Sequence, residues 1–378
     1  MNKKSILFIN QSSGYLMVDI INAHVPYYDE IVLLTGFLNP REAPLNAKVR
    51  VKTGITYQRS SSIKRLLTWF VFWLQSLYLI FFKYRKHQLY FVSNPPLNTF
   101  TARWLKRDLA FLVYDIYPEA LAQHNIISKE SWFYKYWEAS NQKLYKKAKH
   151  LFTLSQGMAS AMKVPESENH KLRVVPVWTN NDFFKEIPSS KNKFLKKLKL
   201  KDKFIVSYSG NLGKTHPVEK VFEMAEQLAQ DDDILFLIIG EGDKKSQLVA
   251  RQKERQLPNL KILDFQPTEL FPHVLAAVNV GVVTLESDAA DLSVPSKTFN
   301  LMSAAKPILS IANRSSELAH IIKTNAIGEN FSEDELKKMC DFILKLKTDP
   351  EIYQSMQKQS KKTSLKYSSK NAKQMIFV

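Results

Sequence analysis

Short apolar runs alternate with amphipathic segments along most of the chain, which indicates strands and helices that follow one another in turn. In the first half, continuous apolar runs predict buried strands at residues 5–10, 30–35, 88–93, 110–114, 150–154 and 172–175. The pattern restarts at residue 204, with an amphipathic helix expected at 218–230 and strands at 204–209, 234–239, 260–263, 280–284 and 307–311. Apolar strands separated by helices are typical of parallel sheets buried on both faces. The sequence therefore predicts an α/β protein with two doubly wound units.

The chain has 378 residues, which is long enough for two such units. Because 45% of these residues are hydrophobic, each unit can bury a core. We expect them to join near residues 177–188. The predicted domains are residues 1–178, residues 179–360, and a lysine-rich C-terminal helix at 361–378 that crosses back to the first domain. This size and composition exclude a small disulfide-stapled domain, a fibrous repeat and a disordered chain.

The single cysteine, Cys340, excludes an intrachain disulfide framework and a cysteine-rich metal cluster. The N-terminus enters a strand-like run without the pattern of a secretory leader, so a reducing, cytoplasmic setting is expected. The histidines show no H-x-x-x-H spacing, and the acidic run at residues 231–233 is interpreted as a solvated turn. We therefore expect no metal and no other cofactor.

A large positive charge points to anionic partners. The chain carries 54 Lys and Arg against 36 Asp and Glu, a net charge of +18, which favours nucleic acid, acidic lipid or phosphorylated small molecules. The lysine-rich run at 191–203 is interpreted as a solvated helix face. Residues 60–110 hold eight basic side chains against Asp108 alone. Because no nucleic-acid-binding motif is present, nucleic acid is not the expected partner.

The run from Leu66 to Phe82 (LLTWFVFWLQSLYLIFF) is apolar except for three polar residues and has basic residues on both sides. As a helix it would reach about 25 Å, short of a bilayer core, and a spanning helix would separate the first strands from their sheet. Two interpretations stay open: a core helix of the first domain, or a helix at an anionic membrane surface with Lys83, Arg85 and Lys86 at the headgroups. The aromatic residues favour the second, and predict a protein peripheral on the inner face of the cell membrane.

Two segments of the second unit are candidates for anion binding. The loop Ser209-Gly210-Asn211-Leu212-Gly213-Lys214 follows a strand and precedes a helix, so its backbone N–H groups and Lys214 can meet an anion; a plain turn is the alternative. Further on, Ser296 is expected to cap a helix. Lys297 lies in the first turn of that helix, where a positive charge is unfavourable to the helix dipole. This indicates that Lys297 binds an anion.

These segments resemble GT-B glycosyltransferases of family 4, the retaining nucleotide-sugar enzymes. The resemblance rests on SYSGNLGKTH (207–216), LFLIIGEGDKKSQL (235–248) and SVPSKTFNLMSAAKPIL (293–309), with VYDIYPEAL, LSQGMASAM and VVPVWTNNDFF in the family's order. The last of the three is similar to the V-P-S-K signature of the N-acetyl-L-fucosamine transferase subgroup. The implied fold is GT-B, two Rossmann-like domains facing a cleft, with the acceptor on the first and the nucleotide sugar on the second.

The resemblance also implies site residues. Expected at the donor are Gly210, Asn211, Gly213, Lys214, Gly240, Glu241, Gly242, Phe265, Gln266, Val294, Pro295, Ser296, Lys297 and Asn300. In the first domain, Asp115 matches the position where relatives carry a reacting His or Asp, and Glu119 is the second candidate for the acid/base role. Asp115 could instead cap a helix. Ser13 and Gly14 belong to the N-terminal loop expected near the acceptor.

Four positions depart from the family pattern. Two glutamates found in many relatives are Leu292 and Asn300 here, and a neutral amide holds a hydroxyl more weakly than a carboxylate does. Asn211 stands where relatives often carry an arginine, and Ala305 replaces the glycine before Lys-Pro.

The function implied by the resemblance is sugar transfer, with retention, from a nucleoside diphosphate donor to a hydroxyl. UDP is the favoured nucleotide. A polyprenyl-diphosphate-linked glycan of bacterial surface polysaccharide is the expected acceptor, since it would lie at a membrane. The alternatives are a non-catalytic GT-B partner subunit, because both glutamate positions are substituted, and a nucleotide-sugar 2-epimerase.

Overall fold

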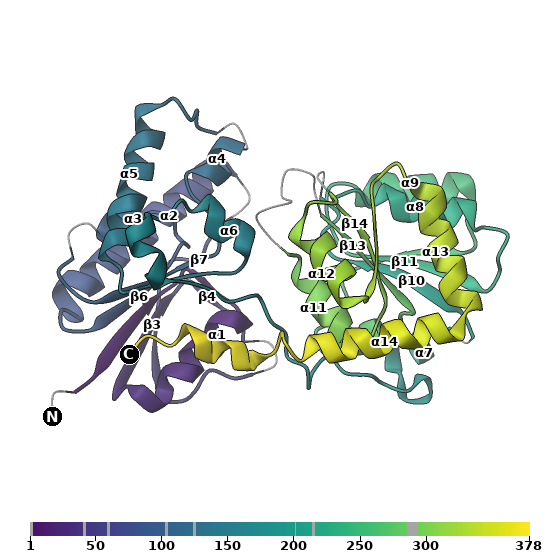
Figure 1. Ribbon diagram of the computed structural model, residues 1–378, viewed down its shortest axis with the longest axis horizontal. Helices are drawn as coiled ribbons and strands as arrows, with labels where there is room; N and C mark the ends of the chain where they lie inside the picture. The colour runs from purple at the N-terminus through teal and green to yellow at the C-terminus, as the bar shows by residue number, and fades with distance from the viewer. Residues whose placement is uncertain are drawn as a thin grey trace. The chain divides into compact units, whose positions relative to one another are not determined.

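The computed structural model divides the chain into two compact units (Figure 1). Unit 1 contains Met1–Pro176 and Ser369–Val378, and unit 2 contains Val177–Ser368. The sequence analysis ended the first domain at residue 178, two residues later than the structure does. It ended the second domain at residue 360, eight residues earlier than the structure does. The structure describes residues 3–40, 43–58, 61–102, 105–123, 126–200, 202–213, 216–285 and 294–378.

The sheet of unit 1 is parallel, in the order β5-β3-β1-β6-β7-β8-β9. Its strands are β1 (Ser5–Ile9), β3 (Glu30–Thr35), β5 (Val49–Thr53), β6 (Gln88–Val92), β7 (Leu109–Val113), β8 (His150–Thr153) and β9 (Leu172–Val174). A short pair, β2 (Ser12–Ser13) and β4 (Phe37–Leu38), lies beside it. Because β1 lies inside the sheet and later strands add on both sides, the unit is doubly wound, with its switch point between β1 and β6.

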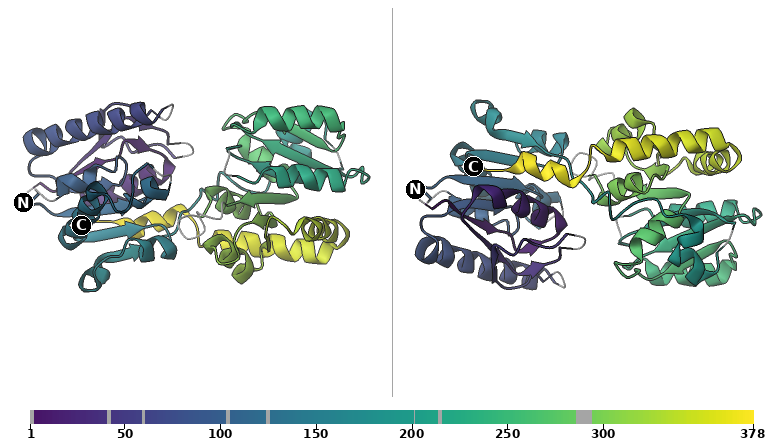
Figure 2. Two further views of the ribbon diagram at one scale, coloured as in Figure 1. Left: turned by 90° about the horizontal axis from the view of Figure 1, so that it is seen from above. Right: turned by 90° about the horizontal axis from the view of Figure 1, so that it is seen from below.

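Helices cover both faces of this sheet (Figure 2). They are α1 (Tyr15–His24), α2 (Ser62–Tyr78), α3 (Asn98–Ala102), α4 (Glu119–Gln123), α5 (Trp132–Lys147) and α6 (Gln156–Ala161). A π-helical turn, Leu79–Lys83, continues α2. Serine side chains cap three of these helices, with Ser61, Ser131 and Ser155 each accepting a hydrogen bond from a first-turn N–H.

Unit 2 repeats the plan with the strand order β12-β11-β10-β13-β14-β15, again parallel. The strands are β10 (Phe204–Ser209), β11 (Ile234–Ile239), β12 (Leu260–Leu263), β13 (Val280–Thr284), β14 (Ile308–Ile311) and β15 (Gly328–Phe331). The helices are α7 (Lys193–Leu198), α8 (Glu219–Gln227), α9 (Lys245–Arg255), α10 (Phe271–Ala277), α11 (Ser296–Ser303), α12 (Glu317–Asn325), α13 (Leu336–Thr348) and α14 (Pro350–Ser364). Every residue of β11 and β13 is buried, as expected for strands covered on both faces.

The C-terminal segment returns to unit 1. Helix α14 ends at Ser364, and a 3₁₀ segment, Ser369–Met375, packs on α1. The backbone N–H of Phe377 donates to Nε2 of His24 (3.0 Å), and the Tyr28 hydroxyl donates to the Phe377 carbonyl. The return is therefore a short 3₁₀ segment held by buried hydrogen bonds, where the sequence analysis expected a helix at 361–378.

Candidate nucleotide-binding and acceptor sites

Two glycine loops meet at the carboxyl edge of the unit 2 sheet, one after β10 and one after β11. The N–H of Leu212 donates to the carbonyl of Glu241 (2.8 Å), and the N–H of Lys244 donates to that of Leu212 (3.0 Å). A Cβ added at Gly240 would lie 1.9 Å from the Gly210 carbonyl oxygen. Only glycine allows so close a backbone approach, which explains why this position carries no side chain.

Lys297 reaches this edge from the first turn of α11, which follows β13. Strands β10 and β13 are neighbours, so α11 and the Gly210 loop lie at the switch point, where open α/β sheets bind ligands. The Lys297 ammonium is 3.9 Å from the centroid of the Tyr208 ring, and a Cβ added at Gly210 would lie 2.6 Å from Nζ. The structure therefore brings together Gly210 and Lys297, two of the predicted donor-binding residues.

The surroundings of Lys297 favour its neutral form when the site is empty. Burial lowers the pKa of Lys297 to about 7. Within the part of the chain that the structure describes, no carboxylate lies within 4.0 Å of its ammonium. Burial also raises the pKa of Tyr208 to about 12, so that its hydroxyl stays neutral and donates to the Asn211 carbonyl (2.7 Å). A diphosphate at this edge would find a partly buried amine able to take up a proton.

The N-terminus of α11 differs from the prediction. Its N-cap is Pro295, and Ser296 is the first helical residue and is exposed, so Ser296 does not cap the helix. Pro295, with φ −57° and ψ 128°, has the extended backbone of an N-cap residue. It has no side-chain oxygen that could accept a hydrogen bond from the helix. No side chain in the described ranges bonds the first-turn N–H groups, which leaves the end of the helix open to an anion.

Further donor-site candidates lie around the turn after β11. Lys245 bridges the carboxylates of Glu241 (2.6 Å) and Asp264, and hydrogen bonding to Asp264 and Glu241 raises the pKa of Lys245. Phe265 is exposed, and the Gln266 amide donates to the Asp264 carbonyl (2.9 Å). The sequence analysis missed Lys245, although its i,i+4 spacing from Glu241 is a signal for an ion pair.

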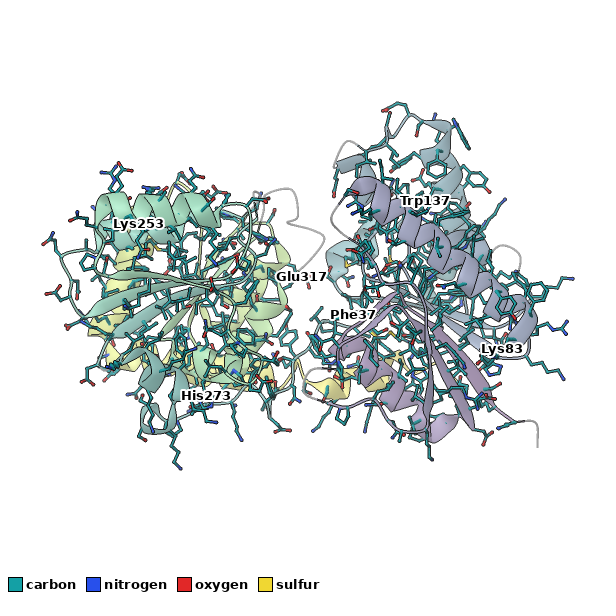
Figure 3. The ribbon with its side chains drawn as sticks, turned by 180° about the vertical axis from the view of Figure 1, so that it is seen from behind. Phe37, Lys83, Trp137, Lys253, His273 and Glu317 are labelled. Atoms are coloured by element: carbon teal, nitrogen blue, oxygen red, sulfur yellow. The ribbon has the colours of Figure 1, made fainter. Side chains whose placement is uncertain are left out.

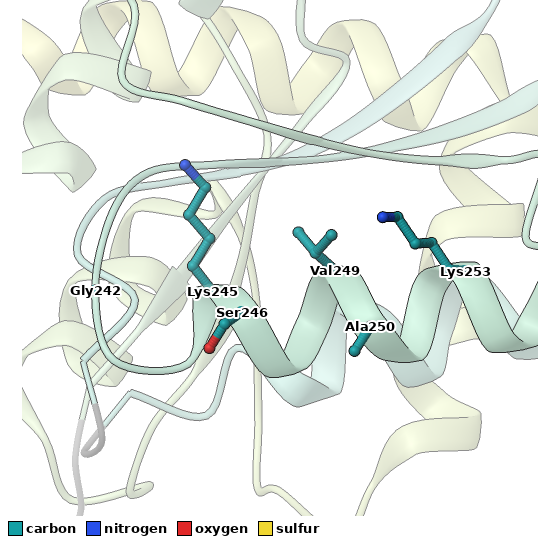
Figure 4. Close-up of a pocket in the computed structure, with 6 residues that line it drawn as sticks. All are labelled: Gly242, Lys245, Ser246, Val249, Ala250 and Lys253. Atoms are coloured by element: carbon teal, nitrogen blue, oxygen red, sulfur yellow. The ribbon is translucent and has the colours of Figure 1, made fainter.

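A cavity of about 590 Å³ runs from this turn along α9. Figure 4 shows the residues that line it, with Lys245, Val249 and Lys253 projecting from one side of the helix. Ser246, Ala250 and Gly242 complete the lining. The positive charge of Lys245 is balanced by Glu241 and Asp264, so this lining does not by itself make an anion site.

The remaining predicted donor residues have different environments. Asn300 is buried, and its side-chain oxygen accepts a hydrogen bond from the Thr179 hydroxyl (2.6 Å). Asn211 is exposed, its amide nitrogen 2.9 Å from where a Cβ on Gly213 would lie. Val294 is partly buried next to Pro295. Lys214 and Leu292 lie outside the described residues.

In unit 1, hydrogen bonds connect the loops that follow β1, β6 and β7. The Gln11 N–H donates to the Asn94 carbonyl (2.9 Å), and the N–H groups of Tyr114 and Asp115 both donate to Ser93 Oγ. These strands are adjacent, so their loops surround the switch point of the unit 1 sheet. The structure thus brings the loop of Ser13 and the loop of Asp115 to the same edge.

The side chains at this edge are not equally accessible. Ser13 is buried and accepts a hydrogen bond from Thr35 (3.1 Å), whereas a Cβ added at Gly14 would meet nothing within 4 Å. Asp115 is exposed. Helix α4 begins only at Glu119, four residues later, so Asp115 is not its N-cap.

Glu119 is turned toward α5. Its Oε1 accepts a hydrogen bond from the Tyr134 hydroxyl (3.4 Å), and no described residue bonds its buried Oε2. Burial raises the pKa of Glu119, so this carboxyl keeps its proton to higher pH than an exposed glutamate does. Asp115 is therefore the more accessible carboxylate of the two, and Glu119 is partly buried.

The acidic run at 231–233 forms a turn, but it is more than a solvated one. Lys347 on α13 lies 2.6 Å from Asp231 and 3.3 Å from Asp233, which ties the turn to the helix. Across the described residues, no cluster of three His, Cys, Asp or Glu side chains could hold a metal ion.

The chain is similar to known glycosyltransferases. Residues 189–363, most of unit 2, match the family described as Glycosyl transferases group 1. The chain is 28% identical over 261 residues to the probable glycosyltransferase WbjE of Pseudomonas aeruginosa, covering 67% of this chain and 65% of WbjE. It is 30% identical over 123 residues to WcaI of Escherichia coli K12, named as a putative colanic acid biosynthesis glycosyl transferase, covering 32% of this chain and 30% of WcaI. The chain therefore spans less than two thirds of either curated relative.

The fold is shown by solved structures. HepE from Anabaena, in complex with UDP and glucose, matches over 98% of both chains with a TM-score of 0.70 at 15% identity. The chain thus has the GT-B fold, with two Rossmann-like domains, and the fold predicted from the sequence is confirmed.

Proposed function

We propose that this protein is a glycosyltransferase that moves a sugar from a nucleoside diphosphate to a hydroxyl acceptor in bacterial surface-polysaccharide biosynthesis. The observation that carries the proposal is Lys297, a partly buried amine packed against the Gly210 backbone at the switch point of unit 2. The match of residues 189–363 to the group 1 glycosyltransferases, and the polysaccharide role in the name of WcaI, support it.

The chemistry of the leaving group fits this arrangement. In sugar transfer the departing diphosphate gains negative charge, and groups already aimed at that charge lower the barrier. Lys297, the N–H groups of the Gly210 loop and the open N-terminus of α11 are such groups. A lysine can supply the positive charge that a divalent ion supplies elsewhere, so we propose a metal-independent reaction. UDP is the proposed nucleotide, supported by the UDP bound to HepE.

The acceptor would be handled by unit 1. Asp115 is exposed at the carboxyl edge of the sheet, so it can orient or deprotonate an acceptor hydroxyl or stabilise an oxocarbenium-like sugar. Glu119, with its raised pKa, is the second candidate for proton transfer. We also propose retention at the anomeric carbon, which the V-P-S-K resemblance supports. We also propose that the protein is cytoplasmic and that its acceptor is a polyprenyl-diphosphate-linked glycan.

Nucleotide binding tests the donor site directly. UDP, GDP, ADP, CMP and dTDP are titrated by calorimetry with and without magnesium, and we expect UDP to bind without it. Lys297→Ala should weaken UDP binding on the order of 100-fold, because a charge-assisted contact to phosphate is lost. Lys196→Ala, an exposed lysine of α7, is the matched control and should bind as wild type. Equal binding by both variants would contradict the assignment.

Transfer must be tested separately from binding. Asp115→Asn should keep UDP affinity and lose most transfer to a lipid-linked acceptor, because the amide cannot take a proton. A wild-type chain that binds UDP-sugars and transfers to no acceptor would instead indicate a non-catalytic GT-B partner. This second candidate is supported by the two positions where many relatives carry glutamates, which are Leu292 and Asn300 here. The side-chain oxygen of Asn300 is moreover already bonded to Thr179.

A further inference from the structure

One face of α2 and its π-helical extension is apolar and uncovered. Ile63, Leu66, Leu67, Phe70, Leu74, Tyr78, Phe81 and Phe82 are each 39–79% exposed. The six on α2 itself fall within about 120° of the helix circumference, and together with Phe81 and Phe82 on the extension they make up what we call the α2 stripe. Both views of Figure 2 show α2 along the outer edge of unit 1. Isolated exposed apolar residues are ordinary, but a continuous stripe of eight marks an interaction surface.

The opposite face of the helix belongs to the core. Trp69, Phe72 and Ile80 are buried, and the Trp73 indole donates to the Thr101 hydroxyl (2.7 Å). The Gln11 side chain donates to the Thr68 carbonyl (2.9 Å). The segment Ile63–Lys83 is long and apolar enough to cross a bilayer. A third of its most apolar stretch is buried, however, and hydrogen bonds to Gln11 and Thr101 hold that buried face against unit 1. The helix is therefore suited to lie on a surface and not to cross it.

The charge around the stripe specifies what covers it. Between residues 44 and 107 the sequence has twelve Lys and Arg and no Asp or Glu. Lys64 lies at the start of α2, and Lys83, Arg85 and Lys86 lie at its end, all exposed. In Figure 3 the side chains around Lys83 project outward from unit 1. A second copy seated on the same stripe would set this positive charge against itself. Anionic headgroups would complement it.

We propose that the α2 stripe docks unit 1 on an anionic lipid bilayer, with the apolar side chains among the acyl chains and the flanking basic residues at the phosphates. Apolar burial and attraction to anionic headgroups act together in such interfacial helices. Tyr78 on the stripe is of a type that suits the region between headgroups and acyl chains, and Phe70 and Phe82 add apolar surface beside it.

The docking helix also contacts the loop of the candidate acceptor site. The Trp69 ring lies edge-on to Tyr117, with 5.7 Å between centroids, and it stacks on Tyr57 at 5.8 Å. Tyr117 is two residues from Asp115. The surface that meets lipid and the loop that carries Asp115 thus pack as one body within unit 1. A consequence of docking, which rests on the proposed function, is that Asp115 would be brought to a lipid-linked acceptor.

Vesicle flotation with the full chain tests the docking. We expect binding to phosphatidylcholine vesicles that contain 30% phosphatidylglycerol, and much weaker binding to phosphatidylcholine alone or in high salt. Leu67→Asp should reduce the bound fraction at least about tenfold, because it places a carboxylate among the acyl chains. Leu365→Asp, at an equally exposed leucine of unit 2, is the matched control and should float as wild type. Circular dichroism and melting temperature should be unchanged in both variants, since both side chains are exposed.

Charge is tested by a second matched pair. The triple change Lys83→Gln, Arg85→Gln and Lys86→Gln should weaken binding to anionic vesicles by about two orders of magnitude, because each basic residue near the surface contributes about fivefold. The triple change Lys191→Gln, Lys196→Gln and Lys197→Gln removes the same net charge from the α7 region. It should have little effect.

Absence of wild-type binding to anionic vesicles, equal losses in the paired variants, or a dimer in solution that Leu67→Asp dissociates would overturn the proposal. Flotation requires no sugar transfer, so its failure is distinguishable from failure of the proposed function. If both hold, Leu67→Asp should lose transfer to an acceptor in vesicles and keep transfer to a water-soluble acceptor analogue.

Discussion

Binding of UDP should take up a proton from solution, because burial holds the pKa of Lys297 near 7 in the empty site. A diphosphate beside the ammonium favours the charged form and raises that pKa. At pH 8 an amine of pKa 7 is about 10% protonated, so binding should consume about 0.9 proton; at pH 7 it should consume about 0.5. The affinity for UDP should therefore fall as the pH rises above 7.

The size of the effect follows from the same pKa. Between pH 7.5 and 9 the apparent affinity should fall about twentyfold, since the protonated fraction of Lys297 falls by that factor. This window lies above the second phosphate pKa of about 6, so the ligand's own titration contributes little. Tyr208, with a pKa of about 12, stays neutral throughout. Lys306 has a pKa lowered to about 8, but it precedes β14 at the opposite edge of the sheet and bonds the Ala276 carbonyl.

Calorimetry in two buffers of different ionisation enthalpy measures this uptake. The difference in observed enthalpy at pH 8 gives the number of protons transferred per UDP bound. Lys297→Met, which removes the amine and keeps most of the side-chain volume, should bind weakly with no buffer dependence. Tight binding by wild type with the same enthalpy in both buffers would refute the reasoning.

Three further predictions concern stability. Ala305 sits at φ +56°, where an L-residue is strained by roughly 1–2 kcal/mol, so Ala305→Gly should raise the free energy of unfolding by about 0.5–1 kcal/mol in urea titrations once the greater freedom of unfolded glycine is subtracted. Gly240→Ala should cost about 1–3 kcal/mol in the same titrations and abolish UDP binding, whereas Gly14→Ala, whose Cβ meets nothing, should do neither. Burial lowers the pKa of His24 to about 4, so as the pH falls from 6.5 to 4 the fold should lose about 3 kcal/mol, and His24→Gln should flatten that dependence.

Much of the fold was accessible from the sequence because buried parallel strands are apolar at every position. The strands predicted at 204–209 and 234–239 coincide with β10 and β11 to the residue. Strand β5, with the sequence VRVKT, was missed because it lies at the edge of its sheet and alternates apolar with charged residues. Strand β15, GENF, has no apolar run at all. Edge strands need fewer apolar residues, so a search for continuous apolar runs overlooks them.

The candidate site was predictable only in part. Glycines and lysines that follow a strand are visible in the sequence, and the resemblance assigned Gly210 and Lys297 to one ligand. The Tyr208 ring beneath Lys297 and the bond from Thr179 to Asn300 depend on distant segments that meet in the fold. The periodicity of residues 66–82 could not separate a core helix from a surface helix, because aromatic residues occupy both faces of α2.

The C-terminal segment has a consequence for the order of folding during synthesis. Unit 2 is one continuous stretch, Val177–Ser368, so all of its strands can pair as soon as that stretch has been translated. Unit 1 begins first yet must wait, because Phe377 closes the bonds to His24 and Tyr28 only after all of unit 2 has been made. The first half of the protein is thus completed by residues translated after the second half. Cleavage just before Ser369 should leave unit 2 intact and expose the apolar surface of α1 on unit 1, to which a chaperone could bind.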